Sequence, residues 1–528
     1  MGVETVSAPE RAGSGLQLIG PPLACSGGHN PMVLQQLFDA VPGAVFCGNR
    51  DVEVTGLEYD SRRVVAGQVF FAIPGMKQNG ARFIPEALSR GAVAIVSEAA
   101  PPLSPANEPA TWVQVPQARI AMAMAANRYY GYPSREIKLI GVTGTNGKTT
   151  VAYLLASILE VGGWKPAMFG TIEYRLGSGE SGQRWPAPNT TPESLDLQRM
   201  LRQVVERGGR STVMEVSSHA LALDRVAGCK FHATVFTNFS RDHLDFHGDL
   251  ESYFAAKEKL FVPSETNAAP SIAVMNADDP RTAALRAKVQ GRVITYAVNA
   301  KADVVAREWK GGRHGLEFTA ETPAGRVEIR SPLLGRHNVY NLLASTATAM
   351  TLEIPPEAIS RGILPVRVPG RLEAIEQGQP FGVFVDYAHT DDALRHLLAS
   401  AREWKDEGRI ILVFGCGGER DRSKRPLMGI AAGEADKVIL TSDNPRSEDP
   451  LGILNDVIVG LQKVRANYEV EPDRAKAIEM ALREARPGDT ILLAGKGHEA
   501  YQLIGDLKIH FDDCEVAHTV LRKLGFDK

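Results

Sequence analysis

The feature that most constrains this chain is a glycine-rich loop set between an apolar strand and a helix. Residues 141–150 read GVTGTNGKTT. The apolar run at 137–142 predicts a buried strand, and residues 149–163 place aliphatic side chains on one face before two glycines, which predicts a helix. A unit of this kind directs backbone N–H groups and a helix N-terminus at a phosphate. The segment therefore predicts a nucleotide-binding domain of the α/β class.

The side chains of this loop indicate how a nucleotide would be held. Lys148 is expected to reach the β- and γ-phosphates, and the hydroxyl of Thr149 is expected to bind Mg²⁺. The usual GxxxxGK[ST] spacing is not met, because Val142 occupies the first glycine position. The loop fits the shorter form GTNGKTT, which follows a strand and opens a helix as a phosphate loop must.

Apolar strands that end in polar residues continue along the chain in two series. VMEVSS, TVFTNFS and IAVMNADD follow the loop, and a second series, which begins after residues 369–371, consists of FGVFVDYAH, IILVFGCGGERD, KVILTSDNPR and TILLAGKGHE. Such strands are typical of parallel sheets with functional residues at the carboxyl ends of the strands. A length of 528 residues suggests about three or four domains. We therefore expect a mostly parallel central sheet and a separate doubly wound C-terminal domain.

Composition excludes several classes of protein. Lys plus Arg is 59 and Asp plus Glu is 62, and a net charge of −3 argues against a broad basic face for nucleic acid. No apolar run is long enough for a transmembrane helix, and the N-terminus lacks the apolar core of a signal peptide. The five cysteines are scattered without a CxxC pair, which fits neither a disulfide framework nor a zinc site. We expect a reduced, cytoplasmic protein with a flexible leader at residues 1–30.

Several motif residues have ordinary explanations when each is considered alone. Glu215 is a strand-end carboxylate that could bind Mg²⁺, composition favours a solvated helix lysine at Lys257, and Asn338 near a helix start is typical of a cap. The Asp and His residues at 242–247 suit magnesium beside a phosphate loop better than zinc. GCGGERD is not a dinucleotide turn, because Arg420 stands where a third glycine is required.

Taken in order, these motifs resemble the Mur ligase family of peptidoglycan synthesis. The ordered set is TGTNGKTT, EVSSHAL, FTNFSRDHLDFHG, GRHNVYN, PGRLE, DYAHTDDAL, GCGGERD, DNPR and GKGHE, within a match from about residue 59 to residue 501. The resemblance implies an α/β protein of three domains. After the leader, these are an N-terminal UDP-binding domain at 31–116, a central P-loop ATPase at 117–368, and a C-terminal Rossmann-like amino-acid-binding domain at 369–528.

Within the family, the chain looks most similar to members that add meso-diaminopimelate to UDP-N-acetylmuramoyl-L-alanyl-D-glutamate. The resemblance implies that ATP phosphorylates the D-glutamyl γ-carboxylate and that the amine of diaminopimelate attacks the acyl phosphate. ATP and Mg²⁺ are the implied cofactors. The implied partners are these small-molecule substrates, with no nucleic acid and no membrane, and we expect a monomer.

The resemblance also implies roles for individual residues at matching motif positions. The catalytic set is Lys148, Glu215, His243 and Lys257, and the metal ligands are Thr149, Glu215, His243 and Lys257, the last as a carbamate. The implied nucleotide contacts are Gly144, Thr145, Asn146, Gly147, Lys148, Thr149, Thr150, Asn338, Arg371 and Asp386. The implied contacts to the UDP-linked dipeptide are Tyr59, Ser61, Met76, Lys77, Gln78, Asn189, Thr190, Thr191, Ser217 and Arg225. The implied diaminopimelate site consists of Arg420, Asp443, Asn444, Pro445, Arg446, Gly495 and Glu499.

Two departures from the family pattern and three alternatives remain open at this point. Leu223 replaces a common glutamine, which removes one polar substrate contact, and Asp391 replaces a proline in DYAHTP. The nearest alternatives are a ligase that adds L-lysine and a folylpolyglutamate synthase, although the YDSR turn at 59–62 and the DNPR loop speak against the folate enzyme. A nucleotide-switched protein is the alternative of another class, but a GTP switch would need an NKxD motif and the chain has no Asn-Lys dipeptide.

Overall fold

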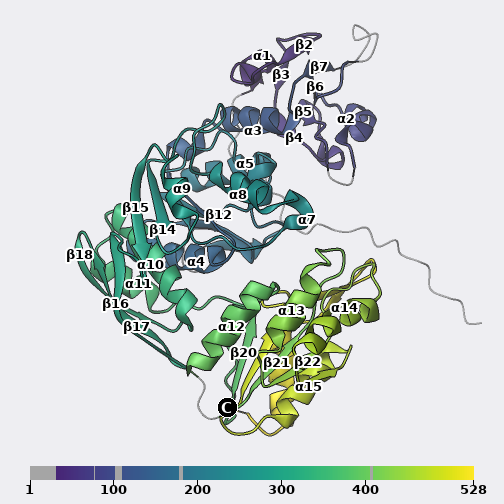
Figure 1. Cartoon of the computed structure of the whole chain (residues 1–528). Helices are drawn as coiled ribbons and strands as arrows, with labels where there is room; N and C mark the ends of the chain where they lie inside the picture. The colour runs from purple at the N-terminus through teal and green to yellow at the C-terminus, as the bar shows by residue number, and fades with distance from the viewer. Residues whose placement is uncertain (1–30, 76–77, 102–109, 178–181, 405–407, 528) are drawn as a thin grey trace, which may run out of the picture.

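The structure is a computed structural model that describes residues 31–75, 78–101, 110–177, 182–404 and 408–527. Three α/β domains follow one another along the chain, and the central domain lies between the other two (Figure 1). Each domain is built on its own main sheet, and helices cover the sheet faces.

The N-terminal domain has a five-stranded sheet in the order β2-β7-β6-β5-β4. Strands β4 to β7 are parallel and β2 is antiparallel at the edge. Every residue of β6 is buried, as is expected of a parallel strand covered on both faces. The strands are β1 (Met32–Val33), β2 (Val45–Cys47), β3 (Glu53–Val54), β4 (Gly56–Glu58), β5 (Gln68–Phe71), β6 (Ala94–Ser97) and β7 (Thr111–Gln114), and the helices are α1 (Leu34–Phe38), α2 (Ile84–Ser89) and α3 (Ala118–Tyr129).

The central domain has an eleven-stranded sheet in the order β11-β10-β9-β12-β8-β13-β14-β15-β16-β17-β18. The seven strands from β9 to β16 in this order are parallel, and antiparallel strands extend both edges. The strands are β8 (Lys138–Thr143), β9 (Ala167–Phe169), β10 (Glu173–Leu176), β11 (Gln183–Pro186), β12 (Ser211–Glu215), β13 (Ala233–Phe236), β14 (Ile272–Asn276), β15 (Arg292–Ala297), β16 (Val304–Gly312), β17 (Gly315–Thr322) and β18 (Gly325–Ser331).

Helix α4 (Lys148–Val161) connects the phosphate loop to the core of the central domain. Leu154, Leu155, Ile158 and Leu159 on its inner face are 0% exposed. Burial of each such side chain contributes about 1.5–3 kcal/mol, so packing fixes the helix, and its N-terminus, beside β8. The other helices are α5 (Ser194–Glu206), α6 (Ser218–Ala222), α7 (Leu244–His247), α8 (Leu250–Glu258), α9 (Thr282–Arg286), α10 (Arg336–Thr351) and α11 (Pro356–Ile363).

The C-terminal domain has a six-stranded sheet in the order β19-β20-β24-β21-β22-β23. All of its strands except the edge strand β19 are parallel, which is the doubly wound arrangement. The strands are β19 (Glu373–Ala374), β20 (Gly382–Asp386), β21 (Ile410–Phe414), β22 (Lys437–Leu440), β23 (Tyr468–Val470) and β24 (Thr490–Ala494), with a separate hairpin of β25 (Tyr501–Ile504) and β26 (Leu507–His510). The helices are α12 (Asp391–Trp404), α13 (Lys424–Ala432), α14 (Pro450–Lys463), α15 (Arg474–Glu484) and α16 (Asp513–Lys523).

The fold class expected from the sequence is confirmed: the chain is an α/β protein of three domains with mostly parallel sheets. The domain boundaries stay predictions, and the leader at 1–30 lies outside the described residues. Helix α3, assigned above to the central domain, packs Ala118, Ala121 and Met122 into the N-terminal core. Within the described ranges, no helix is both long and apolar enough to cross a membrane.

Candidate active site

The phosphate loop runs from the end of β8 to the first turn of α4, and its glycines are required by close packing. A Cβ on Gly144, which has φ +149°, would lie 1.9 Å from Thr237 Oγ1. A Cβ on Gly147, which has φ +87°, would lie 2.3 Å from Asn341 Oδ1. Gly147 also caps α4, so the loop delivers the helix N-terminus to the site.

Two lysines, the half-buried Lys148 and the buried Lys257, converge on the same carbonyl of this loop. Lys148 Nζ donates to Gly144 O at 3.0 Å and Thr145 O at 2.9 Å, and Lys257 Nζ donates to Gly144 O at 2.7 Å. Lys257 is 2% exposed, so the expectation of a solvated helix lysine is wrong. In the part of the chain that the structure describes, neither amine pairs with a carboxylate.

Burial lowers the pKa of both amines. Desolvation lowers the pKa of Lys148, and desolvation together with the charge of Lys148 lowers the pKa of Lys257 well below its ordinary value. Two ammonium groups that share one carbonyl repel each other. Lys257, whose pKa is lowered further, is therefore the amine that loses its proton more readily. A neutral lysine amine is a nucleophile, which is the form that reacts with an electrophile such as CO₂.

Glu215 brings a carboxylate from the end of β12 to the base of the site. It is 1% exposed, and its oxygens accept from Thr149 Oγ1 at 3.0 Å, Thr171 N at 2.8 Å and Thr171 Oγ1 at 3.0 Å. These partners are hydroxyl and amide groups, and no Lys, Arg or His nitrogen of the described residues lies within ion-pair distance of Glu215.

This donor set fits magnesium in part. Mg²⁺ takes one or two carboxylates and completes its shell with water and substrate phosphates, and the Thr149 hydroxyl next to Glu215 meets that pattern. Lys257 fits only if it has gained a carboxyl group, since an ammonium cannot bind a cation. Among the described residues, no three His, Cys, Asp or Glu side chains form a group that could hold a metal ion by themselves.

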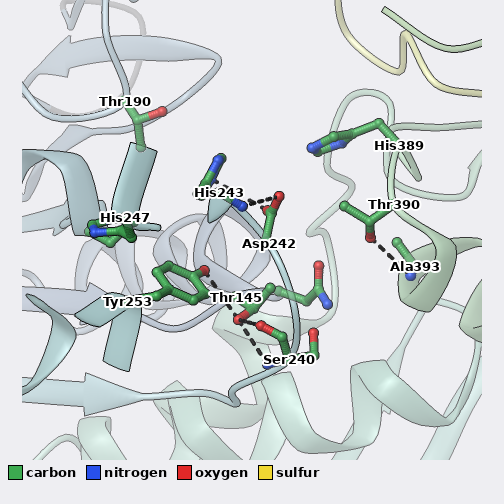
Figure 2. A network of polar contacts seen from close by, with 12 residues as sticks. Thr145, Thr190, Ser240, Asp242, His243, His247, Tyr253, His389, Thr390 and Ala393 are labelled. Atoms are coloured by element: carbon green, nitrogen blue, oxygen red, sulfur yellow. Dashed lines mark hydrogen bonds and ion pairs between the residues drawn. The ribbon is translucent and has the colours of Figure 1, made fainter. Parts of the chain in front are cut away.

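Histidines and a carboxylate face one another across the domain junction (Figure 2). Asp242 and His243 precede α7, and His389 faces them from the C-terminal domain. Burial lowers the pKa of His243 to about 3 and that of His389 to about 4, so both rings are neutral near pH 7. His243 has φ +53°, an uncommon left-handed conformation for a side-chain-bearing residue and one that recurs at functional sites.

The central and C-terminal domains line one cavity of about 480 Å³. Most nucleotide-site, catalytic and metal-ligand candidates lie in its lining. The predicted residues that line it are Thr145, Asn146, Gly147, Lys148, Thr149, Thr150, Asn189, Thr190, Glu215, Ser217, Arg225, His243, Lys257, Arg371, Asp386 and Arg420. Asn338 does not: it is 2% exposed inside α10, where its Nδ2 donates to Leu334 O at 2.7 Å, and Gly335 occupies the cap position.

Polar contacts join the two domains directly at the phosphate loop. Asp392 Oδ2, at the start of α12, accepts from Asn146 Nδ2 at 3.2 Å and from Ser240 Oγ at 2.8 Å. Arg371 Nη2, at the junction between the domains, lies 3.4 Å from Thr149 Oγ1. The C-terminal domain is therefore in contact with the residues expected to hold the nucleotide.

The loop that contains Asn189 and Thr190 is fixed to the end of β12 by Thr191. Thr191 is 0% exposed, and its Oγ1 donates to Glu215 O at 2.9 Å and accepts from Ser217 N at 3.0 Å. Arg225 Nη1 donates to Thr191 O at 3.0 Å. Thr191 therefore lies behind the cavity wall and holds together the residues that line it.

The candidate amino-acid residues form a second cluster in the C-terminal domain. Asn444 Nδ2 donates to Glu499 Oε2 at 2.8 Å, and Arg446 Nη1 donates to Gly418 O at 2.7 Å. A Cβ on Gly495 would lie 2.8 Å from Asp443 Oδ2. Of this set, Arg420 lines the large cavity, while Asp443, Asn444, Pro445, Arg446, Gly495 and Glu499 lie together outside its lining.

Burial and the nearby charge of Asp443 raise the pKa of Glu499. The buried Lys496 supplies one cation here, with its Nζ 3.7 Å from Glu499 Oε2, and the two carboxylates would also attract the ammonium of a ligand. The cluster therefore combines acceptors for an amine with the guanidinium groups of Arg420 and Arg446.

The N-terminal candidates lie away from the cavity. Tyr59 Oη donates to Asp196 at 2.6 Å, which joins the first domain to α5, and Ser61 Oγ donates to Glu86 at 2.6 Å. Gln78 is exposed. Met76 and Lys77 lie outside the described residues.

Several cavity-lining residues were not selected from the sequence. Asp242 was considered above only as one of the Asp and His residues at 242–247 that suit magnesium, and His389 stands in the motif DYAH; neither was given a role of its own, although both line the cavity. Thr171 and Tyr253 have no signal in the sequence, because they reach the site through tertiary packing: Thr171 bonds to Glu215, and Tyr253 Oη lies 3.3 Å from Thr145 Oγ1.

Comparison with known proteins gives a consistent result over most of the chain. Family models described as "Mur ligase family, catalytic domain", "Mur ligase middle domain" and "Mur ligase, glutamate ligase domain" match residues 53–130, 142–349 and 370–497. The UDP-N-acetylmuramoyl-L-alanyl-D-glutamate–2,6-diaminopimelate ligase of Solibacter usitatus is 52% identical over 90% of this chain and 94% of its own length. That of Geobacter metallireducens is 44% identical over 93% of this chain and 99% of its own length.

Solved structures agree with these matches. A structure of a UDP-N-acetylmuramoyl-L-alanyl-D-glutamate–2,6-diaminopimelate ligase has a TM-score of 0.66 at 31% identity and covers 94% of this chain and 99% of its own. MurF from Acinetobacter baumannii has a TM-score of 0.63 at 19% identity and covers 89% of this chain and 96% of its own, which shows a common fold.

Proposed function

The chain belongs to the Mur ligase family, and on that premise we propose that it is an ATP-dependent ligase that joins meso-2,6-diaminopimelate to UDP-N-acetylmuramoyl-L-alanyl-D-glutamate. The observation that supports this best is the cavity in which the phosphate loop and Glu215 meet Arg371 and Arg420. A ligase must bring an activated carboxyl group to an attacking amine, and a cavity shared by two domains provides for that. The relatives with this name match nearly the whole chain.

In the first step, the D-glutamyl γ-carboxylate attacks the γ-phosphorus of ATP and forms an acyl phosphate with release of ADP. Lys148 and the N-terminus of α4 offset negative charge on the transferring group, and Arg371 adds a second cation from the domain junction. Thr149, Glu215, His243 and the carbamate of Lys257 would hold Mg²⁺, which offsets phosphate charge when bound. The lowered pKa of the buried Lys257 amine supports the carbamate, because only the neutral amine adds CO₂.

In the second step, a neutral amine of diaminopimelate attacks the acyl carbon, and phosphate leaves from the tetrahedral intermediate and takes up the proton that the amine loses. Asp443 and Glu499 accept from the substrate's ammonium groups, and Arg446 binds the distal carboxylate with its guanidinium. Arg420 lines the cavity and assists at the proximal end.

The remaining candidates hold the UDP-linked substrate and the nucleotide base. Asn189, Thr190, Ser217 and Arg225 line the cavity on the side that would receive the dipeptide. Tyr59, Ser61, Met76, Lys77 and Gln78 are assigned to the uridine diphosphate, Asn338 to adenine and Asp386 to the nucleotide site. A monomeric state and a cytoplasmic location complete the proposal.

One assay tests the ligase and separates it from its rivals. The protein is incubated with ATP, Mg²⁺ and UDP-N-acetylmuramoyl-L-alanyl-D-glutamate, together with either meso-diaminopimelate or L-lysine, and the product is identified by its mass. We expect ADP release that needs both substrates and a tripeptide that contains diaminopimelate. A lysine product would favour the lysine-adding ligase, and ADP release without either substrate would favour a nucleotide switch.

A further inference from the structure

Two loops of the candidate amino-acid site are tied together by one buried arginine. Arg425, in the first turn of α13, is 0% exposed. Its Nη2 donates to both carboxylate oxygens of Glu448, at 2.9 and 3.0 Å, and to Gly417 O at 3.3 Å. Glu448 also accepts from the backbone N–H of Glu419. We propose that Arg425 and Glu448 are positioning residues that fix loop 417–420 against loop 443–448 and thereby set the selectivity for the acceptor amino acid.

The two loops are in direct backbone contact, so a small shift of either one moves the other. Gly418 N donates to Asn444 O at 2.9 Å, and a Cβ on Gly418 would lie 1.9 Å from Pro445 O. Arg446 Nη1 donates across the same contact to Gly418 O at 2.7 Å. The direction of the Arg446 guanidinium therefore depends on the separation of the loops.

Both loops also contain a residue in a conformation that needs support. Glu419 has φ +51° and Arg446 has φ +53°, and neither is glycine. Left-handed backbone at such residues persists only where the surrounding structure holds it. Glu448 supplies that hold at Glu419 through its bond to the backbone N–H, and Arg425 keeps Glu448 in place.

The opposite side of loop 443–448 is held independently. Arg446 N donates to Leu503 O at 3.0 Å, and Leu503 N donates to Asn444 Oδ1 at 2.9 Å, so the β25–β26 hairpin fixes that side. Loss of the Arg425–Glu448 contact would thus leave loop 443–448 attached to the hairpin. Loop 417–420 would then be held against it only by the bonds of Gly418 to Asn444 and Arg446 and by the contact of Ser447 with Glu419, so its position would be less fixed. The expected consequence is altered recognition of the acceptor rather than collapse of the domain.

A second carboxylate on the same arginine provides a matched control. Asp456, in α14, accepts from Arg425 Nη1 at 2.9 Å, and its side chain contacts neither loop through any hydrogen bond of the described residues. Glu448→Gln and Asp456→Asn each remove one negative charge from the same guanidinium at nearly constant volume. They differ in that only Glu448 joins Arg425 to the backbone of loop 417–420.

The inference rests on the proposed function, so the experiment measures acceptor use by the full-length enzyme. Values of kcat and KM for meso-diaminopimelate and L-lysine, KM for ATP and the thermal midpoint are determined for the wild type, Glu448→Gln, Asp456→Asn and Arg425→Lys. Glu448→Gln should raise KM for diaminopimelate about 10-fold and lower the diaminopimelate-to-lysine ratio of kcat/KM, with KM for ATP within about 2-fold. Arg425→Lys should have the same effect, because an ammonium cannot reach both carboxylate oxygens of Glu448 and the carbonyl oxygen of Gly417. Asp456→Asn should keep the wild-type ratio.

The outcomes separate the two proposals. A selective wild type whose ratio is unchanged in Glu448→Gln, or is lost equally in Asp456→Asn, would overturn the positioning role and leave the ligase assignment intact. A lowered thermal midpoint with unchanged KM values would also overturn it, since the cluster would then act on stability alone. A wild type that forms no product with either amino acid would overturn the proposed function and, with it, this inference.

Discussion

Charged side chains are arranged differently in two parts of the candidate active site. We call them the phosphate half, which contains the phosphate loop and Lys257, and the acceptor half, which contains loops 417–420 and 443–448 and the residues packed around them. In the phosphate half, Lys148 and Lys257 donate to backbone carbonyls and, among the described residues, pair with no carboxylate. In the acceptor half, the buried Arg425 is paired with two carboxylates, and Arg474 pairs with Asp513 at 2.6 Å with both side chains 0% exposed. The first half keeps its lysines available for an anionic ligand, whereas in the second half these two buried arginines are neutralised by carboxylates of the protein.

The difference indicates what each half is built to do. A buried cation without a counter-ion opposes folding, so its presence suggests a functional requirement for a charged ligand. A buried arginine whose charge is paired with carboxylates fixes the shape of the loops around it. We therefore expect substitutions in the phosphate half to abolish turnover with little loss of stability, and substitutions in the acceptor half to alter which amino acid is used.

The strongest test of this contrast is Lys148→Ala. Removal of the Lys148 charge from beside the transferring phosphoryl group should reduce ligation by about 10³-fold or more, because the helix N-terminus, Arg371 and bound Mg²⁺ do not replace a cation at that position. ADP formation at saturating substrates and the thermal midpoint are measured together. Lys138→Ala, an exposed lysine at the start of β8, is the control and should retain full activity. A folded Lys148→Ala protein with near-normal turnover would remove the phosphate-loop assignment.

Lys257→Ala should be nearly as damaging if the lysine acts as a carbamate. The variant loses the anionic group, and added acetate or formate should restore part of the activity by filling the vacated volume. Activity is measured with and without the acid, and Lys259→Ala, two residues along the chain with a half-exposed side chain, serves as the control. Substantial activity of Lys257→Ala without added acid would contradict the role. Absence of rescue alone would not, because the buried site can exclude the acid.

The phosphate half was largely predictable from sequence because its signals are local. The expected strand at 137–142 and helix at 149–163 correspond to β8 (Lys138–Thr143) and α4 (Lys148–Val161). Glycine positions and aliphatic periodicity are properties of contiguous residues, so both elements could be located. The antiparallel extensions β10–β11 and β17–β18 were not predicted, because strand pairing depends on distant partners.

The sequence could not predict how deeply a side chain is buried or which residues contact one another across the domain junction. Lys257 lies in a short helix whose pattern does not distinguish a solvated from a buried face, and its burial results from packing against the phosphate loop. Asp392 was not selected from the sequence, although it bonds to Asn146 across the domain junction. Arg425 gave no signal either, because its partners Glu448 and Asp456 are far along the chain.

In the acceptor half, Arg446→Ala should change selectivity rather than ATP use. Arg446 Nη1 is bonded to Gly418 O, which orients the guanidinium, and we expect its other N–H groups to bind the ligand carboxylate. Loss of one charge-assisted hydrogen bond costs about 1.5–3 kcal/mol, or roughly 10- to 150-fold in kcat/KM for diaminopimelate. Arg446→Lys should recover only part, because an ammonium cannot reproduce two parallel bonds.

The kinetic comparison of diaminopimelate with lysine tests whether Arg446 determines the choice of amino acid. Values of kcat/KM for diaminopimelate and lysine, and KM for ATP, are compared in the wild type and both Arg446 variants. The wild type should strongly prefer meso-diaminopimelate. Equal use of lysine by the wild type, or an Arg446→Ala variant that keeps the preference, would defeat the specificity claim and leave the ligase assignment in place.

The smallest expected effect concerns stability and tests whether Lys257 is held as a neutral amine. Burial and the charge of Lys148 lower the pKa of Lys257 in the folded protein below its ordinary value of 10.5. At any pH between the folded-state pKa and 10.5, the unfolded chain therefore binds a proton that the folded chain does not. The free energy of unfolding therefore contains a contribution that rises with pH until about 10.5 and opposes folding at neutral pH. Lys257→Met keeps the length of the side chain without titrating, so in CO₂-free buffer its thermal midpoint should exceed that of the wild type by a few degrees at pH 7. The difference should shrink as the pH approaches 10, and Lys259→Met should show no such trend. A constant difference across this range would mean that Lys257 is protonated in the folded protein, and the phosphate half would then hold two charged lysines rather than one charged and one reactive amine.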